Sequence, residues 1–472
     1  MATLADIQKV IKDNNIRRVD LIVTDLVGRW HHLSIPATRL DKSVVERGQG
    51  FDGSSLRGFQ SVEESDMLLR PDLDTAQIDP TESEPTLKLI CNVHDPMTGE
   101  RYLRDPRYVA TKAEKYLADS GIADKAFFGP EIEFFIFDSV EFSLATNSSS
   151  HSVSASEAAW GSDRDGDSEA TGYLIPRNQG YTPVAPFDKL SDMRWEIAEK
   201  LEQVGVKVET HHHEVASGGQ GELATKFNTL RVKADESQWY KHIVRNVANG
   251  HGKFATFMPK PVFDENGTGM HVHQSLFLDG KPLFYDENGY AKLSETARHY
   301  IGGLLHHGPS LLAFCAPSTN SYKRLVPGFE SPIFLEYSQR NRSAAVRIPT
   351  YEVTPASKRV EFRPPDPSAN IYLALSAMLM AGLDGIRKKI DPGDPVDENI
   401  YDLPPEEAAR LSAVPTSMEE AVEALGNDHD YLLHGSVFTQ DVIDHYISLK
   451  EQEARDVFLH PVPAEFVHYF HI

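Results

Sequence analysis

Three short segments of the chain each carry two polar side chains that are separated by a single residue. The segments are PEIEF with Glu131 and Glu133, GMHVHQS with His271 and His273, and RVEFR with Glu361 and Arg363. Side chains two positions apart on a β-strand point to the same face of the sheet. The spacing therefore predicts three strands that each present paired functional groups on one face. Ordinary solvated faces of half-exposed strands are the alternative interpretation.

The same groups would need cations if this face were buried. At an effective dielectric of about 20, two carboxylates about 5 Å apart repel by roughly 3 kcal/mol, and buried charges must be paired or bind a metal. The segment THHHEVASGGQGE adds Glu214 and Glu222 around a loop of small residues. Such carboxylate-rich ligation favours Mg²⁺ or Mn²⁺. The three histidines lack the spacing of a zinc motif such as H-E-x-x-H.

Arginines follow in the second half of the chain, beside carboxylates and turn-forming residues. Arg324 and Glu330 stand in NSYKRLVPGFESP, and SQRNRSAAVRIP contributes Arg340, Arg342 and Arg347. These side chains either form ordinary ion pairs or bind an anionic phosphoryl group and a carboxylate substrate. The glycine-rich segment NGTGMHVH suits close backbone contact with a small ligand. The chain has no G-x-x-x-x-G-K-[ST], so bound ATP would not lie on a P-loop.

The motifs are distributed over helical and strand-like segments of an α+β chain. Helices are predicted at 4–14, 104–121, 190–204, 236–250, 294–313 and 368–388, and strands at 19–28, 86–95 and 128–138. A hairpin is expected to turn near Gly28. Residues 144–170, rich in Ser, Asp and Gly, predict a mobile surface insertion. We expect a small domain of residues 1–103 and a larger one of residues 104–472.

Composition is that of an ordinary globular protein. The 472 residues are 40% hydrophobic and 25% charged, and the formal net charge of −23 argues against a general nucleic-acid surface. Cys91 and Cys315 form no C-x-x-C pair, so neither a disulfide framework nor a thiolate metal site is expected. The first residues predict a helix rather than a signal peptide, and no apolar run approaches the ~18 residues of a membrane span. We expect a cytoplasmic protein without nucleic-acid or membrane partners.

Taken together, the motifs resemble those of the bacterial type I glutamine synthetase family. The matching segments are FDGSS (51–55), GPEIEFF (129–135), HHHEVASGGQGE (211–222), KPVFDENGTGMHVHQS (260–275), NSYKRLVPG (320–328), RNRSAAVRIP (340–349) and RVEFRPPDPSANIYL (359–373). They occur in the family's order and cover nearly the whole chain. The resemblance implies a small β-grasp N-terminal domain and a large catalytic domain with a curved antiparallel sheet. It implies ATP-dependent ligation of ammonia to L-glutamate through γ-glutamyl phosphate, for nitrogen assimilation.

The resemblance also implies a role for each matching residue. One divalent cation, Mg²⁺ or Mn²⁺, would be held by Glu133, Glu214 and Glu222, and a second by Glu131, His271 and Glu361. ATP would contact Glu209, Phe227, His273, Ser275, Arg342 and Arg347. Glutamate and ammonium would contact Tyr181, Asn266, Gly267, Arg324 and Arg363. Asp52, Glu330 and Arg342 would act in catalysis, with a carboxylate taking a proton from ammonium.

The same resemblance implies partners. The chain would form a dodecamer of two hexameric rings, with Asp52 of one subunit completing its neighbour's active site. The C-terminal HPVPAEFVHYFHI is similar to a segment that inserts into the opposing ring, although its aromatic content alone also fits packing within the chain. Tyr401, in DENIYDLPPEE, matches a loop that an adenylyltransferase converts to O-AMP-tyrosine in the adenylylation-regulated subclass.

The sequence departs from the family pattern at two places. Two other functions are alternatives to glutamine synthesis. Ala356 and Ser357 stand where many relatives carry a lysine that contacts phosphate, and Phe59 stands where some carry a tryptophan near the adenine. One alternative is a ligase that joins glutamate to another amine, and the other is a binding protein that has lost catalysis. Asp52, Tyr181 and Glu330 together favour ammonia, and the complete metal and arginine sets favour an enzyme.

Overall fold

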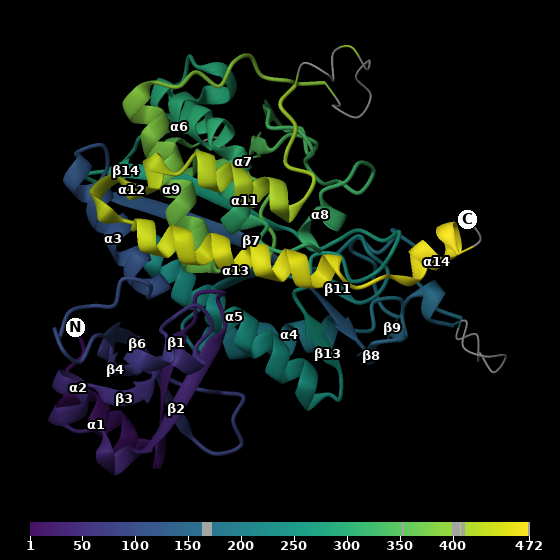
Figure 1. The fold of residues 1–472 in the computed structure, drawn as a ribbon. Helices are drawn as coiled ribbons and strands as arrows, with labels where there is room; N and C mark the ends of the chain where they lie inside the picture. The colour runs from purple at the N-terminus through teal and green to yellow at the C-terminus, as the bar shows by residue number, and fades with distance from the viewer. Residues whose placement is uncertain (163–171, 352–353, 399–405, 407–410, 471–472) are drawn as a thin grey trace.

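A computed structural model describes residues 1–162, 172–351, 354–398, 406 and 411–470 of the chain (Figure 1). The N-terminal part folds around one mixed sheet with the strand order β2-β1-β6-β4-β3, to which β5 adds by pairing with β6. Its elements are α1 (Leu4–Asp13), β1 (Arg18–Thr24), β2 (Trp30–Pro36), α2 (Lys42–Arg47), β3 (Gln49–Asp52), β4 (Asp66–Pro71), β5 (Gln77–Ile78) and β6 (Thr86–His94). Strands β1 and β6 run parallel, and the other pairs run antiparallel.

Local sequence accounts for the start of this part. Thr3 and Asp6 form a reciprocal capping box that begins α1. Gly28 has a φ of +91°, which suits glycine because it lacks a Cβ, and it lies in the tight β1–β2 connection as predicted. The N-terminal core is formed by buried aliphatic residues of β1, β4 and β6, including Val19, Leu21 and Leu89.

The larger part is built on a curved sheet with the order β10-β11-β7-β14-β18-β17-β16. Every pair along it is antiparallel except β16 with β17, and β12, β13 and β15 add at its margins. The strands are β7 (Lys125–Phe137), β10 (Val208–His213), β11 (Gln220–Thr225), β12 (Asn228–Thr229), β13 (Phe254–Thr256), β14 (Met270–Leu278), β15 (Lys281–Pro282), β16 (Tyr337–Gln339), β17 (Val346–Ile348) and β18 (Val360–Phe362).

The larger part contains the following helices, most of which contribute to the main hydrophobic core beside this sheet. They are α3 (Pro106–Ser120), α4 (Ser191–Gln203), α5 (Leu230–Gly250), α6 (Glu295–His306), α7 (Gly308–Cys315), α8 (Ser321–Arg324), α9 (Ile371–Lys388), α11 (Met418–Asn427), α12 (Asp430–Leu433), α13 (Gln440–Phe458) and α14 (Pro463–Tyr469). Helix α9 is buried at every residue from Ile371 to Gly385, so it is apolar around its whole circumference. Helix α14 extends away from the body (Figure 1).

The structure changes two sequence-based expectations about elements. We expected a mobile surface insertion at 144–170, and its first part belongs to a largely exposed antiparallel hairpin of β8 (Ser139–Ala145) and β9 (Ser148–Ser154), while residues 163–170 lie outside the described residues. Cross-strand hydrogen bonding outweighs the weak apolar content of this segment. The helix predicted at 294–313 is instead two helices, α6 and α7, because Pro309 lies in the first turn of α7 and cannot donate a backbone hydrogen bond. No helix in the described ranges is both long and apolar enough to cross a membrane.

Candidate active site

The registers of six adjacent strands, from β10 to β17 in the sheet order, bring the predicted functional side chains together. On one side of β7, His212 of β10 is paired with Glu222 of β11, and Glu222 is paired with Glu133 of β7. On the other side, Glu131 is paired with His271 of β14. Paired residues on neighbouring strands have Cβ atoms about 5 Å apart and share a face. The two-residue spacing in each segment thus becomes a compact cluster.

A second row of paired side chains, from β14, β18 and β17, lies on the same face of the sheet. His273 of β14 is paired with Glu361 of β18, and Glu361 is paired with Arg347 of β17. His273 Nε2 lies 2.9 Å from Glu131 Oε1, which links the two rows. The strand interpretation of the three polar pairs is therefore confirmed, and the solvated-face alternative fails because Glu133, Glu222 and Glu361 are buried.

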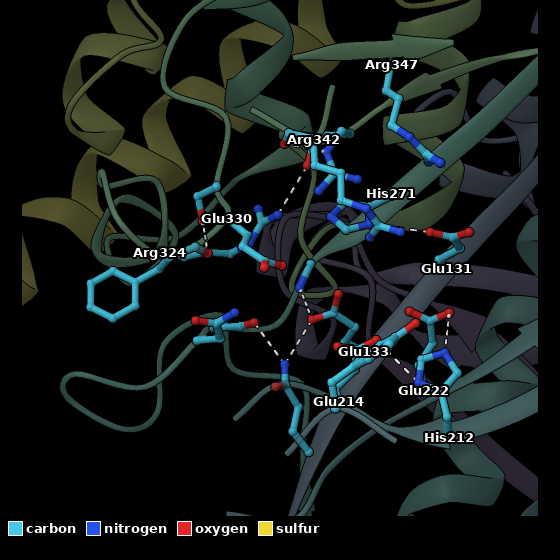
Figure 2. A pocket seen from close by; sticks show the side chains of 18 of the residues that line it. Glu131, Glu133, His212, Glu214, Glu222, His271, Arg324, Glu330, Arg342 and Arg347 are labelled. Atoms are coloured by element: carbon cyan, nitrogen blue, oxygen red, sulfur yellow. Dashed lines mark hydrogen bonds and ion pairs between the residues drawn. The ribbon is translucent and has the colours of Figure 1, made fainter. Parts of the chain in front are cut away.

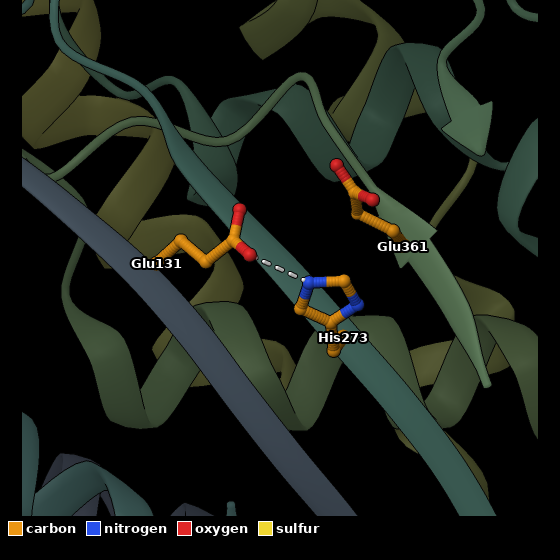
Figure 3. A group of neighbouring side chains, drawn as sticks. All are labelled: Glu131, His273 and Glu361. Atoms are coloured by element: carbon orange, nitrogen blue, oxygen red, sulfur yellow. Dashed lines mark hydrogen bonds and ion pairs between the residues drawn. The ribbon is translucent and has the colours of Figure 1, made fainter. Parts of the chain in front are cut away.

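Two groups of side chains have the composition of a divalent-cation site. Glu131, His273 and Glu361 have ligand atoms within 4.8 Å of one another (Figure 3), and so do His212, Glu214 and Glu222. Each group differs from the predicted ligand set in one member, since His271 and Glu133 were expected where His273 and His212 appear.

The two expected ligands remain close to these groups. His271 Nδ1 lies 3.4 Å from Glu131 Oε2, and both histidines of β14 therefore face this carboxylate. Glu133 accepts hydrogen bonds from the Gly269 amide at 2.8 Å and from Gln220 Nε2 at 3.0 Å. These two donors orient the Glu133 carboxylate toward the cluster.

Burial dominates the electrostatics of the carboxylates on the β11 side. It raises the pKa of Glu133 to about 8, with the neighbouring charge of Glu214 adding to the effect. Burial, followed by the charges of Glu330 and Glu131, raises the pKa of Glu214 to about 7. The pKa of Glu222 is raised well above its ordinary value by burial and by the surrounding carboxylates. A divalent cation reverses this effect by stabilising the ionised form, so the donor set fits hard cations.

On the β14 and β18 side of the cluster, neighbouring cationic groups lower the pKa values of the carboxylates. Burial disfavours the ionised form of Glu131, but His273 and His271 outweigh it and hold its pKa well below the usual range. The pKa of Glu361 is likewise lowered despite burial, chiefly by the charges of Arg363 and His273. Burial and the charge of Arg363 lower the pKa of His271 to about 4, so its ring is neutral at neutral pH and can ligate a metal.

Arginines border the cluster, as Figure 2 shows. Arg363 Nη1 lies 2.6 Å from Glu361 Oε1, and Arg347 pairs with the other oxygen of the same carboxylate. Arg324 is buried and donates to the backbone carbonyl of Pro364 at 2.8 Å. The ordinary ion-pair interpretation therefore holds for Arg347 and Arg363, which both pair with Glu361. The side chains of Arg324, Arg347 and Arg363 also line the cavity described next.

A carboxylate-lined cavity of about 150 Å³, the carboxylate cavity, contains most of the predicted residues. Its walls include the predicted metal ligands Glu131, Glu133, Glu214, Glu222 and His271, and the predicted substrate residues Tyr181, Asn266, Gly267, Arg324, Glu330, Arg342, Arg347 and Arg363. Glu361 does not line it, because its side chain is fully buried beneath the two arginines.

A larger cavity of about 550 Å³ adjoins it, which we call the aromatic cavity because Phe127, Phe227, Phe277 and Tyr351 line it. Four predicted ATP residues lie in its wall, namely Glu209, Phe227, His273 and Ser275. The two cavities share Glu131, His212, Glu222 and Tyr351. An elongated ligand can therefore reach the carboxylate cluster from the aromatic side.

Three of the sequence-based calls fall elsewhere. Asp52 is on β3 of the N-terminal sheet, where it accepts hydrogen bonds from Ser54 and Ser55, and these hydroxyl groups lower its pKa. It lines neither cavity. Phe59 packs against Tyr102 in the N-terminal core, away from both cavities. Tyr401 lies outside the described residues.

Some residues of the site were missed by sequence reasoning. His212 belongs to the HHH tract, which we set aside because its spacing is not that of a zinc motif. Arg359 lines the aromatic cavity beside Ala356 and Ser357, with Nε 3.3 Å from His273 Nδ1. Gln220 donates to both Glu133 and the Gly267 carbonyl. Only the alternation along strand 220–225 could have indicated that Gln220 shares a face with Glu222.

Fold and site together define a class of enzyme that binds divalent cations in a carboxylate cluster next to a cationic, anion-binding wall. Two family models match the chain, the glutamine synthetase beta-Grasp domain at residues 15–96 and the glutamine synthetase catalytic domain at residues 103–469. The chain is 53% identical to glutamine synthetase of Mycolicibacterium smegmatis, covering 100% of this chain and 99% of the relative. It is 50% identical to the Haemophilus influenzae enzyme, covering 99% and 98%.

Solved structures show the same fold. Plasmodium falciparum glutamine synthetase is 28% identical with a TM-score of 0.90, covering 99% of both chains. A GmaS complex with ADP is 27% identical with a TM-score of 0.83, covering 100% of both chains. The chain belongs to the glutamine synthetase family, whose members use ATP and divalent cations to form glutamine from glutamate and ammonia.

Proposed function

We propose that this chain ligates ammonia to L-glutamate at the carboxylate cavity, through a γ-glutamyl phosphate intermediate. The observation that carries the proposal is the junction of the two cavities at the carboxylate cluster. ATP, entering the aromatic cavity, would present its γ-phosphate to the cluster, and glutamate would present its side-chain carboxylate from the opposite side. The family membership and the similarity to a GmaS complex with ADP support ATP as the nucleotide.

Two divalent cations, Mg²⁺ or Mn²⁺, are assigned to the cluster. We assign one to Glu133, Glu214 and Glu222 with His212 beside them, and the other to Glu131, His271 and Glu361 with His273 beside them. When bound, such cations neutralise charge on the transferring phosphoryl group. The burial-raised pKa values of Glu133 and Glu214 support the assignment, since a divalent cation beside them would stabilise their ionised forms.

The side chains of this chain would then act in sequence. Glu209, Phe227, His273 and Ser275 would hold ATP, while Arg342 and Arg347 would contact its phosphates. Tyr181, Asn266, Gly267, Arg324 and Arg363 would hold glutamate and ammonium. The glutamate carboxylate attacks the γ-phosphorus and ADP leaves. Ammonium loses a proton to Glu330 or Asp52, and ammonia displaces phosphate from the acyl carbon. Closure over the site would exclude water, which otherwise hydrolyses the acyl phosphate.

The direct test measures phosphate release with ATP, glutamate and a panel of amines. We expect release that needs glutamate and a divalent cation, and that is faster with ammonia than with methylamine or a polyamine. Excess chelator should abolish it, and Mg²⁺ or Mn²⁺ should restore it. Full activity in chelator would contradict the metal assignment, and preference for another amine would contradict the ammonia assignment.

We propose a homo-oligomer, a dodecamer of two rings, with active sites shared between subunits. Asp52 is exposed on β3 and lines neither cavity of its own chain, which supports its delivery to a neighbour's site. The apolar side chains of α14 are also exposed, with Val467 at 80%.

A domain boundary at 103/104 fits the two separate hydrophobic cores. The unpaired, buried thiols of Cys91 and Cys315 support a location in the reducing cytoplasm.

Adenylylation of Tyr401 remains a proposal from sequence alone. The proposal rests on the match of the acidic and proline-rich segment DENIYDLPPEE to the modified loop of the adenylylation-regulated subclass. Incubation with a bacterial glutamine synthetase adenylyltransferase and labelled ATP should label the wild type and leave Tyr401→Phe unlabelled. Equal labelling of both chains would show that another residue is modified.

A further inference from the structure

A fully buried carboxylate stands directly before the predicted glutamate-binding residues. Glu265 has no exposed surface. Its Oε1 accepts hydrogen bonds from Trp160 Nε1 at 2.8 Å and from the Ser217 hydroxyl. Its Oε2 accepts from the backbone amides of Ser217 and Asn178, each at 3.1 Å. None of the roles proposed for the two cavities involves Glu265.

The four donors come from segments that are far apart in sequence. Asn178 belongs to the 176–182 loop, which carries Tyr181, and Ser217 belongs to the 214–220 loop, which begins with Glu214. A second contact reinforces the first, because the Asn266 amide donates to Asn178 Oδ1 at 2.8 Å. Glu265 therefore joins the two loops to its own loop, which carries Asn266 and Gly267.

Close backbone packing shows that these loops have little freedom around the carboxylate. A Cβ on Gly180 would lie 2.6 Å from the Glu214 carbonyl oxygen, so the 176–182 loop rests directly on the 214–220 loop. A Cβ on Gly218 would lie 2.4 Å from the ring of Trp160, so the indole lies against the same loop. Movement of the Glu265 carboxylate would displace all three loops.

The chemistry of the pocket favours a carboxylate. The three neighbouring residues present four N–H or O–H groups, and an ionised carboxylate is acceptor-only with two oxygens that can each accept two bonds. A glutamine with its NH₂ group at the Oε2 position would leave the Ser217 and Asn178 amides without this acceptor, which is more costly than losing exposed bonds. With its NH₂ group at the Oε1 position it would face the Trp160 N–H, which then has only the Ser217 hydroxyl oxygen, 3.1 Å away, of these two acceptors.

A contact also runs from this residue to the loop that carries Glu330. Lys260 Nζ donates to the backbone carbonyl of Glu265, and the same ammonium lies 3.7 Å from the centre of the Phe329 ring. Phe329 precedes Glu330 and lines the carboxylate cavity with it. The Glu265 loop is thus connected to both sides of the predicted glutamate pocket.

We propose that Glu265 is a positioning residue for glutamate, holding the 176–182, 214–220 and 264–269 loops in the geometry that binds the amino acid. The proposal rests on the proposed function and deepens it. Glu265 contacts no reacting atom, and it lines neither cavity. Its effect is therefore on the glutamate side of the site, because the aromatic cavity is built from other segments of the chain.

The test compares Glu265→Gln with the wild type in KM for glutamate, KM for ATP, kcat and ADP binding by calorimetry. Activity of the wild type with glutamate and ammonia is established first, and its absence would contradict the proposed function rather than this inference. We expect the KM for glutamate to rise about tenfold or more, while ADP affinity and the KM for ATP change by less than about twofold.

Three further variants separate positioning from general destabilisation. Trp160→Phe keeps an aromatic ring and removes one donor, so it should raise the KM for glutamate in the same direction by about threefold. Glu265→Asp keeps the charge and should fall between Gln and the wild type. Asp235→Asn is the matched control, a buried carboxylate held by Arg107 and Tyr372 outside both cavities, and should lower the melting temperature without raising the KM for glutamate.

Two results would overturn the inference. One is an unchanged KM for glutamate in Glu265→Gln. The other is equal loss of glutamate and ADP binding, which is the pattern of a merely structural residue. If Glu265→Gln fails to fold, Trp160→Phe decides the question by the same two measurements.

Discussion

At the scale of single residues, the site combines two features. Its buried carboxylates have pKa values shifted in opposite directions, and one loop residue has an uncommon backbone conformation. Glu330 has a φ of +57°, a left-handed conformation that is unfavourable for a side chain with a Cβ. It lines the carboxylate cavity, and its charge contributes to the raised pKa of Glu214. This conformation places Glu330 in the cavity wall, which is consistent with the role proposed for it.

Glu330→Ala should impair the ammonia step more than phosphoryl transfer. Loss of a proton acceptor costs about 10²-fold or more, so glutamine formation should fall by about that factor. Formation of ADP in a single turnover with glutamate should fall by less than about tenfold, because the metal ligands and arginines are unchanged. Rapid-quench measurement of both products checks this. Glu336→Ala, which lies outside both cavities, is the control, and equal loss of both steps would refute the role.

At the scale of elements, a buried histidine ties together helices that support the sheet. His307 lies between α6 and α7, with Nε2 2.9 Å from Asp384 of α9 and Nδ1 2.8 Å from Asp428, directly after α11. Its ring stacks on Tyr431 of α12 at a centroid distance of 3.9 Å. Burial disfavours the imidazolium, but the hydrogen bonds to Asp384 and Asp428 outweigh it and raise the pKa of His307. One side chain thus joins several helices of the main core.

His307→Gln should destabilise the chain in a pH-dependent way. Removing one partner of a buried pair costs about 3–5 kcal/mol, and we expect the lower end because Asp428 is partly exposed. A folded-state pKa above the unfolded value of about 6.5 means that the stabilisation is fully present below pH 6.5 and is lost as the pH rises through the folded value. The loss in urea-unfolding midpoint should therefore be larger at pH 6 than at pH 9. A pH-independent loss would contradict the charged state of His307.

At the scale of the whole molecule, the C-terminal segment leaves apolar side chains outside the core of its own chain. Phe458 is 81% exposed and Phe470 is 69% exposed, and α14 extends from the body at the end of α13 (Figure 1). Several exposed apolar side chains on one segment are typical of a surface that another chain covers. The alternative of simple packing within the chain does not hold for this segment, so the exposed face supports the proposed oligomer.

Deletion of residues 460–472 should weaken assembly and, through it, activity. Light scattering should show smaller species than for the full-length chain, because the apolar contact that we propose between rings would be lost. Activity per chain should fall where assembly falls, because Asp52 lines neither cavity of its own subunit. A point variant, Val467→Asp, places a charge on the same face and should act in the same direction. A truncated chain that stays fully assembled would show that the segment has another role.

Much of the site could be predicted because strand periodicity is local. The two-residue spacing of Glu131 with Glu133, and of His271 with His273, determines that each pair shares a face wherever the strand lies. The main helices and the hairpin at Gly28 were predictable for the same reason, since caps, turns and apolar spacing act over a few residues. The motifs were enough to indicate the family, the cation chemistry expected of it and most residues of the carboxylate cavity, whereas most residues of the aromatic cavity were not predicted.

Only the tertiary structure decided how these pairs meet. Strand register places His273 opposite Glu361 and His212 opposite Glu222, and it depends on packing between segments that are distant in the chain. The sequence therefore left open which histidine faces which carboxylate. It also could not show that Trp160, Asn178 and Ser217 converge on Glu265, or that Asp52 stands apart from the cavities of its own chain. Local patterns determine the direction of a side chain, whereas its neighbours are determined by how the whole core packs.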